Sequence, residues 1–208
     1  MILTSTSFAD GQRLPGELAF CIPDTVQHVC LGGNRNPQLA WSNAPADTKS
    51  FVVICHDPDV PSKGDDVNQE GRTVPASLPR VDFFHWVLID LPVTVNTINE
   101  AEFSSDVTPR GKPGPQSTPP AQQGINNYTD WFAGDHDMNG DYYGYDGPCP
   151  PWNDEIMHHY VFTVYALDIE KLPLCGKFGG PEVRDALAGH ILAEAKITGT
   201  YTLNPALL

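Results

Sequence analysis

The stretch HHYVFTVYALD, residues 158–168, decides the fold class of this chain. After its two histidines it is almost continuously apolar and rich in aromatic and β-branched residues, which is typical of a strand buried on both faces. The runs SFVVICHD (residues 50–57) and DFFHWVLIDL (residues 82–91) have the same character. Amphipathic, Thr-rich runs at residues 2–8 and 196–204 predict two more strands.

One segment, residues 181–195, has the pattern of a helix. Pro181 suits a first helical turn, and Val183, Leu187 and Ile191 recur at helical spacing. Because helices are few and do not alternate with strands, the sequence favours a mainly antiparallel β protein with one late helix.

Two long irregular stretches, residues 61–80 and 104–127, interrupt the predicted strands. The second contains five prolines: Pro109, Pro113, Pro115, Pro119 and Pro120. Neither flanking half has a complete set of strands, so we expect surface loops of a single domain spanning residues 1–208. These loops are predicted at about 61–81 and 104–146.

The chain is strongly acidic. Its 208 residues include 12 Lys and Arg against 26 Asp and Glu, a net charge of −14. This charge disfavours nucleic acid and anionic membrane surfaces as partners, and a phosphate group must be held by a local site. No apolar run approaches the ~20 residues of a membrane span, and the start lacks the features of a signal peptide. We therefore predict a cytoplasmic protein with no membrane insertion.

The cysteines are odd in number and scattered, and no CxxC pair occurs. They are Cys21, Cys30, Cys55, Cys149 and Cys175. This pattern predicts free thiols in a reducing compartment. Cys149 lies between two prolines and near His158 and His159 in sequence, which makes it a candidate thiol nucleophile, although nothing else in the sequence favours that role.

The motif DPDVP, residues 57–61, ends one of the apolar strands. Proline removes a backbone donor and the aspartates can cap a turn, so one interpretation is a sharp strand end. The other is a pair of carboxylates, Asp57 and Asp59, at a strand mouth, where they can orient imidazoles.

His85 lies within the apolar run 82–91. Strict alternation places it on one face with Val87 and Ile89, opposite Trp86. A histidine among apolar residues is either a satisfied core residue or a ligand-binding group, and the run alone does not separate these interpretations.

The segment YDGPCPPW, residues 145–152, is stiffened by prolines and leaves few free backbone N–H groups. Such a loop can cradle an anion at low entropic cost. In the following strand, His158 and Tyr160 share a face; the alternative is a turn beside an edge strand with solvated histidines. Residues 113–170 contain no Lys or Arg, so an anion there depends on imidazole, phenol and backbone donors.

The sequence DHDMNGD, residues 135–141, fits the first seven positions of a calcium loop, with Asp146 at the twelfth. The flanking residues are poor helix formers, so the alternative is an acidic surface turn. No GxSxG, HExxH, GxxxxGK[ST] or GxGxxG motif occurs.

Taken together, the DPDVP turn, the His85-Trp86 strand, and GPCPP followed by HHYVFTVYALD resemble the phosphatidylethanolamine-binding protein family. The resemblance is greatest to its bacterial and archaeal branch, often labelled Raf kinase inhibitor-like. It is weakest over residues 104–146, where this chain carries a longer insert. The resemblance implies a large antiparallel central sheet packed on a smaller sheet, with a helix near the C-terminus.

The resemblance also implies a small cavity for an anion such as phosphate or a phosphoethanolamine-like headgroup. The residues that match the family's site are Asp57, Asp59, Pro61, His85, Gly147, Pro148, His158 and Tyr160. Cys149 is an addition within the Pro-rich loop. The resemblance is compatible with a homodimer, although no stripe of residues marks an interface.

These residues predict a binding module without a cofactor, and not an enzyme. His85 and His158 are expected to donate N–H groups to the anion, with Asp57 orienting one imidazole and the backbone near Gly147 completing the cradle. Tyr160 would donate a phenolic hydrogen bond or form a wall of the cavity. Pro61 would form another wall, and Asp59 would hold the turn together. Kinase regulation is an analogy only. The alternatives are a metal-dependent hydrolase using the His and Asp residues, calcium binding at 135–146, and a protein that acts through its long loops.

Overall fold

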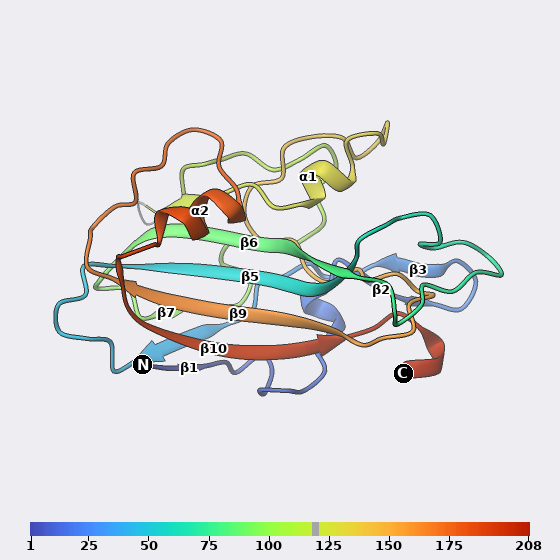
Figure 1. Ribbon diagram of the computed structural model, residues 1–208, viewed down its shortest axis with the longest axis horizontal. Coiled ribbons are helices and arrows are strands. Elements are labelled where there is room, and N and C mark those ends of the chain that lie inside the picture. Colours follow the sequence, from blue (N-terminus) through green and yellow to red (C-terminus); the bar gives the residue numbers. More distant parts are fainter. Residues whose placement is uncertain (118–120) are drawn as a thin grey trace.

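The computed structural model describes residues 1–117 and 121–208. Its larger sheet has neighbouring strands that all pair antiparallel (Figure 1). In spatial order these are β10 (Ile191–Tyr201), β9 (His158–Leu167), β5 (Ser50–Pro61), β6 (Arg80–Pro92) and β8 (Gln122–Gln123). The prediction of a mainly β protein with a large antiparallel sheet is confirmed.

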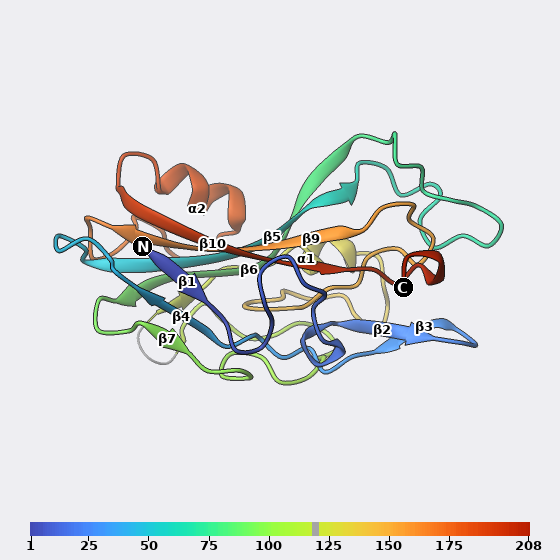
Figure 2. The same ribbon diagram turned by 90° about the horizontal axis from the view of Figure 1, so that it is seen from below.

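Smaller elements cover both faces of this sheet. One smaller sheet contains β1 (Ile2–Thr4), β4 (Leu39–Ser42) and β7 (Thr97–Ile98), and β2 (Cys21–Asp24) pairs with β3 (His28–Leu31). The helices are η1 (Gly16–Leu18), α1 (Tyr128–Trp131), α2 (Gly180–Ala186) and η2 (Pro205–Leu207). Figure 2 shows α2 on one face of the larger sheet and the smaller sheets on the other.

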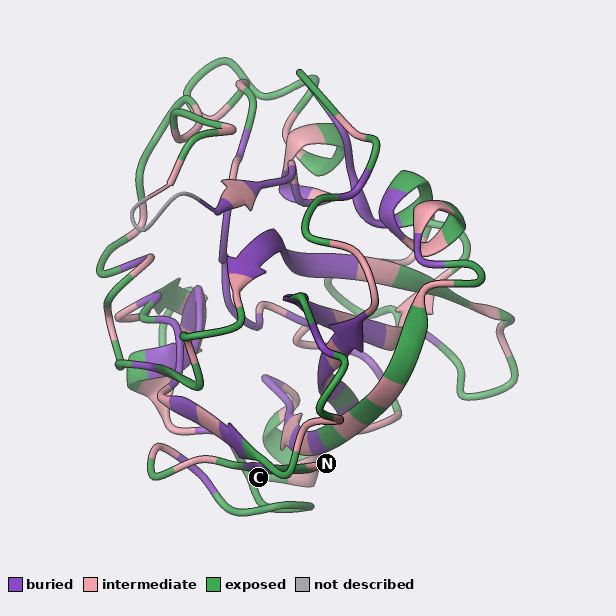
Figure 3. Ribbon diagram, turned by 90° about the vertical axis from the view of Figure 1, so that its left-hand side faces the viewer, coloured by how far each residue is buried: buried purple, intermediate pink, exposed green. Residues whose placement is uncertain are grey.

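The two covered faces explain the continuous apolar runs. Alternate residues of β9, including Tyr160, Phe162 and Val164, pack into the cluster shared with the smaller sheets. On the opposite face, Val52 and Ile54 of β5 pack in a second cluster beneath α2. The central strands are accordingly buried along most of their length, while loops remain exposed (Figure 3).

The predicted helix 181–195 is too long. Helix α2 ends at Ala186, and Ile191 already belongs to β10. Gly189 has φ +83°, a left-handed conformation that ends helices readily. Beyond it the burial alternates, with Ala193 and Ala195 facing the core, so the apolar spacing that resembled a helix belongs partly to a strand.

The prediction that every cysteine is a free thiol is wrong. Cys21 and Cys149 form a disulfide across 128 positions of sequence, which also removes Cys149 as a candidate nucleophile. Cys30 and Cys175 are exposed free cysteines and Cys55 is buried. Because the disulfide forms, free thiols no longer support a cytoplasmic location. That location stays a prediction. No helix in the described part of the chain is long and apolar enough to cross a bilayer.

The two long loops join distant parts of the fold. Residues 62–79 connect β5 to β6, and residues 104–127 include β8 as well as Lys112, whose partly buried side chain pairs with Asp146. Pro119 and Pro120 of the predicted loop lie outside the described residues.

Replacing Cys21 and Cys149 together by Ser tests the bridge. We expect the free energy of unfolding to fall by about 2–5 kcal/mol, because a link that closes a long loop restricts the unfolded chain. Equilibrium urea unfolding measures the change. The matched control is Cys30→Ser with Cys175→Ser, expected to stay within about 0.5 kcal/mol. Equal stability of both double variants would contradict the bridge.

Candidate functional site

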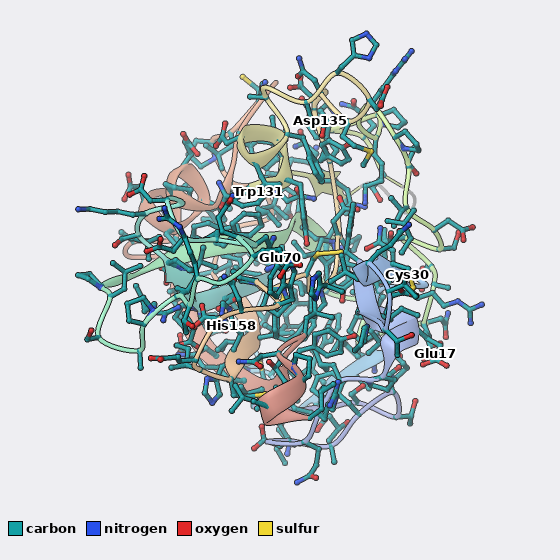
Figure 4. All side chains as sticks on the ribbon, turned by 90° about the vertical axis from the view of Figure 1, so that its right-hand side faces the viewer. Glu17, Cys30, Glu70, Trp131, Asp135 and His158 are labelled. Carbon is teal, nitrogen blue, oxygen red and sulfur yellow. A yellow bond between two sulfur atoms is a disulfide. The ribbon has the colours of Figure 1, made fainter. Side chains whose placement is uncertain are left out.

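A cavity of about 250 Å³ opens where β5, β6 and β9 meet the loops at one end of the larger sheet. Figure 4 views the molecule from this end, with Trp131 and His158 labelled. Five of the predicted site residues line the cavity: Asp57, Pro61, His85, His158 and Tyr160. The other three predicted residues, Asp59, Gly147 and Pro148, are not among its lining residues.

A β-bulge brings His85 to the cavity. The register of β5 against β6 shifts at this residue, so His85 and Trp86 both face the same side of the sheet. The ring of His85 lies 5.1 Å from that of Tyr160, whereas Val87 and Ile89 pack beneath α2 on the opposite face. The prediction that His85 shares a face with Val87 and Ile89 is wrong, because strict alternation fails across a bulge.

His158 lies at the start of β9 between two carboxylates. Its Nδ1 is 2.7 Å from Asp57 Oδ2 and its Nε2 is 3.2 Å from Asp154 Oδ2. The contact with Asp57 confirms that this carboxylate orients an imidazole. Because both ring nitrogens are occupied and the residue is fully buried, His158 has no N–H left for an anion, contrary to the predicted donor role.

Arg80 completes this charge cluster from the start of β6. Its Nη1 and Nη2 donate to the two carboxylate oxygens of Asp154, at 2.6 and 3.0 Å. The bidentate geometry holds residues 150–157 against the sheet. Two carboxylates thus face one guanidinium and one imidazole, so the cluster is electrically neutral when His158 is protonated.

The surroundings of His158 keep it protonated. Burial by itself lowers the pKa of this imidazole, but hydrogen bonds to Asp154 and Asp57 raise the pKa to about 9. Burial raises the pKa of Asp154, but its hydrogen bonds with His158 and Arg80 outweigh burial and lower this pKa below its usual value. His158 is therefore an imidazolium at neutral pH.

His85 has the opposite character. Its Nδ1 lies 2.7 Å from the backbone oxygen of Asp146, and a carbonyl oxygen only accepts, so Nδ1 carries the proton. Burial lowers the pKa of His85 and outweighs the opposing effect of the Asp57 carboxylate. In the neutral ring Nε2 is consequently a bare acceptor, and it has no hydrogen-bond partner within the described residues.

The Pro-rich loop is held by a polar network beneath the cavity. The carboxylate of Asp146 accepts from Asn34 Nδ2 and Asn126 Nδ2, both at 2.7 Å, and pairs with Lys112 Nζ at 2.9 Å. The backbone N–H of Gly147 donates to Asn34 Oδ1 at 2.8 Å. The predicted anion cradle at Gly147 is therefore wrong, because its donor is already used inside the protein.

Pro148 and Asp59 also have structural partners. The carbonyl oxygen of Pro148 accepts from the N–H of Cys21 at 3.0 Å. Asp59 Oδ2 lies 2.8 Å from both the backbone N and the Nδ1 of His159, away from the cavity.

The acidic segment 135–141 folds as a surface turn. Asp135 Oδ1 accepts from the backbone N–H groups of Asp137 and Met138, and Asp141 pairs with Lys177. Asp146, the required twelfth ligand, is buried in the network described above. These contacts contradict the calcium-loop interpretation. Among the described residues, no group of three or more His, Cys, Asp or Glu side chains is placed to hold a metal ion.

The remaining wall of the cavity is aromatic. Phe20 stacks on Tyr128 at 4.6 Å, and Phe132 stacks on Tyr128 at 5.5 Å. Phe83 also lines the space, and Trp131 at the rim is 54% exposed. The cavity thus joins a polar floor to an apolar side that can hold an organic group.

Sequence reasoning missed Asp154, Arg80 and Asn34. Asp154 precedes His158 by four positions, but this spacing has meaning only because the irregular segment between them folds back. Arg80 and Asn34 reach the site from residues distant in sequence, and no local pattern marks them.

The comparisons with known proteins agree with this architecture. A model of the phosphatidylethanolamine-binding protein family matches residues 4–202. The chain belongs to this family. UPF0098 protein YbcL of Escherichia coli K12 is 31% identical over 206 residues, covering 97% of this chain and 87% of that protein. An archaeal UPF0098 protein from Methanothermobacter thermautotrophicus is 29% identical over 203 residues, covering 97% of this chain and 98% of that protein.

Solved structures of the family share the fold. The crystal structure of E. coli YbcL, described as a new member of the mammalian PEBP family, matches with a TM-score of 0.68 at 27% identity, covering 97% of both chains. A Chlamydia trachomatis homologue matches with a TM-score of 0.63 at 27% identity, covering 96% of this chain and 95% of that one. The bacterial and archaeal relatives confirm the branch that the motifs predicted.

The ion cluster makes stability depend on pH. The folded-state pKa of His158, about 9, exceeds the ordinary value of 6.5, so its contribution is complete below pH 6.5 and is lost as pH rises towards 9. The shift corresponds to about 3 kcal/mol. We expect urea unfolding to show this loss, and His158→Gln to be less stable at pH 6.5 with a flatter dependence. An equal slope in both proteins would contradict a protonated His158.

Proposed function

We propose that this protein is a binding module whose cavity holds an anionic group, such as a phosphate or phosphoethanolamine-like headgroup, attached to an apolar body. The observation that carries the proposal is His85 Nε2, an unpaired nitrogen on the polar floor of a cavity with aromatic walls. A concave, mainly apolar space with few polar groups is typical of a small-molecule site.

The floor can accept an anion by taking up a proton at His85. An incoming negative charge stabilises the imidazolium, so Nε2 becomes an N–H donor to the anion while Nδ1 keeps its bond to Asp146. Burial and the nearby Asp57 carboxylate raise the pKa of Tyr160 well above its usual value, so its hydroxyl keeps its proton and contributes a neutral polar group, hydrogen-bonded to Asp57, to the floor. The charge of Asp57 is already balanced by His158.

The apolar wall supplies affinity that the charges do not. The overall charge of −14 opposes the approach of anions, and no arginine lines the cavity among the described residues. Lys63, at the rim, is a flexible cation within reach of an entering ligand. Contact of an organic group with Phe132 and Trp131 therefore favours amphipathic ligands over bare ions.

These features support binding without catalysis. His158 and Asp57 are hydrogen-bonded to each other, so His85 is the one member of the predicted hydrolase cluster left to bind a metal. The geometry therefore does not favour a metal-dependent hydrolase. A role in regulating a kinase rests on analogy with the family alone.

His85→Gln tests the anion site. We expect phenyl sulfate to bind at least about tenfold more weakly to the variant, because a charge-assisted hydrogen bond of about 1.5–3 kcal/mol is lost. Isothermal titration calorimetry measures the affinity. In the unchanged protein, affinity should rise as pH falls from about 8 to 5, since protonated His85 binds the anion. The variant should show a flat profile, because the charge of phenyl sulfate is constant over this range.

His159→Gln is the matched control, since this exposed histidine pairs with Asp59 outside the cavity. It should bind like the unchanged protein. Undiminished binding to His85→Gln, or equal losses in both variants, would argue against His85 as the anion site.

Phe132→Ala tests the apolar side. We expect phenyl sulfate to bind the unchanged protein at least about tenfold more tightly than sulfate, because burying a ring contributes about 1.5–3 kcal/mol. The variant should lose most of this preference while its affinity for sulfate is unchanged. Competition calorimetry compares the two ions. A preference that persists in Phe132→Ala would contradict an aromatic subsite.

A further inference from the structure

The disulfide Cys21–Cys149 forms part of the cavity wall. Cys21 begins β2 and Cys149 lies in the Pro-rich loop, and both residues line the cavity. Cys21 is 6% exposed, while Cys149 is partly exposed. Of the two bridged residues, Cys149 is therefore the more accessible from the cavity. In Figure 4 the bridge is visible as a yellow bond between sulfur atoms.

The two bridged segments are also held together without the sulfur–sulfur bond. The N–H of Cys21 donates to Pro148, and the hydroxyl of Tyr201 donates to the carbonyl oxygen of Cys21 at 2.9 Å. On the loop side, the hydroxyl of Tyr128 donates to the carbonyl oxygen of Gly147 at 2.7 Å. Because these contacts fix both backbones, the two thiols of a reduced bridge stay adjacent and can pair again.

We propose that the Cys21–Cys149 bridge is a thiol–disulfide exchange site that is reached through the cavity, and that its reactants are small dithiols. A thiolate of the dithiol attacks the sulfur of Cys149, and the sulfur of Cys21 leaves as a thiolate. The second thiolate of the reactant then attacks its own first sulfur, forming a cyclic disulfide and releasing Cys149. Two electrons pass to the bridge, and the two protons of the dithiol go to the cysteine thiolates.

The exchange couples the redox state of the bridge to the occupancy of the cavity. A ligand held between His85 and Phe132 blocks the path to Cys149 and slows reduction. This protection rests on the proposed function, whereas the exchange itself does not. The other cysteines do not compete for this role, because Cys30 and Cys175 lie outside the cavity lining and Cys55 is buried.

The test counts thiols in the folded protein carrying Cys30→Ser and Cys175→Ser. The protein is treated with dithiothreitol and iodoacetamide without denaturant, and alkylation is followed by mass spectrometry. Circular dichroism checks that the fold persists. We expect two thiols to appear while the protein stays folded, and the bridge to re-form when oxidised dithiothreitol replaces the reduced form.

Two glycine variants test the route to the bridge. Gly64 lines the cavity rim and Gly134 does not, and an added Cβ at either position meets open space. Gly64→Trp should slow reduction at least about fivefold, because exchange rates depend on access to the attacked sulfur, while Gly134→Trp should leave the rate unchanged. Saturating phenyl sulfate should slow reduction similarly.

The reduction rates distinguish failure of the exchange site from failure of the proposed function. Reduction that occurs only after unfolding, or at equal rates in both glycine variants, would overturn the exchange site. Slower reduction in Gly64→Trp without protection by phenyl sulfate would support the exchange site and count against the proposed function.

Discussion

The buried contact between His158 and Asp57 is the interaction on which the site depends. It joins the start of β9 to the end of β5, and Asp154 extends it to Arg80 at the start of β6. Breaking one member would leave an uncompensated buried charge, which costs far more than an exposed ion pair contributes. The cluster therefore fixes three strands and residues 150–157 around one cavity.

Two histidines of one cavity have opposite electrostatic roles because their neighbours differ. His158 lies between two carboxylates and is held as a cation, whereas His85 faces a backbone carbonyl and aromatic rings and is held neutral. The first organises the floor and the second remains available to a ligand. Pairs of titratable groups driven apart by their environments are a recurrent feature of functional sites.

The sequence was sufficient for the framework because β5, β6 and β9 are buried on both faces, and their apolar runs record that burial directly. It was insufficient for the end of α2, because the apolar spacing of the helix continues past Gly189 into the first residues of β10. The face of His85 depends on a bulge, and the bridge of Cys21 to Cys149 depends on tertiary approach. The partners of Gly147 and His158, namely Asn34 and Asp154, come from irregular segments that no local pattern predicts. Family resemblance located five residues of the cavity lining, but the hydrogen bonds of His158 and Gly147 differ from the roles that it implied.

The protonation states of His85 and His158 give the most direct test of the opposite roles of the two histidines. Long-range ¹H–¹⁵N NMR of the imidazole rings at neutral pH distinguishes the cation from each neutral tautomer. We expect an imidazolium at His158 and a neutral ring protonated at Nδ1 in His85, with Nε2 of His85 gaining a proton when phenyl sulfate binds. A neutral His158, or a ligand-free His85 protonated at Nε2, would contradict these roles.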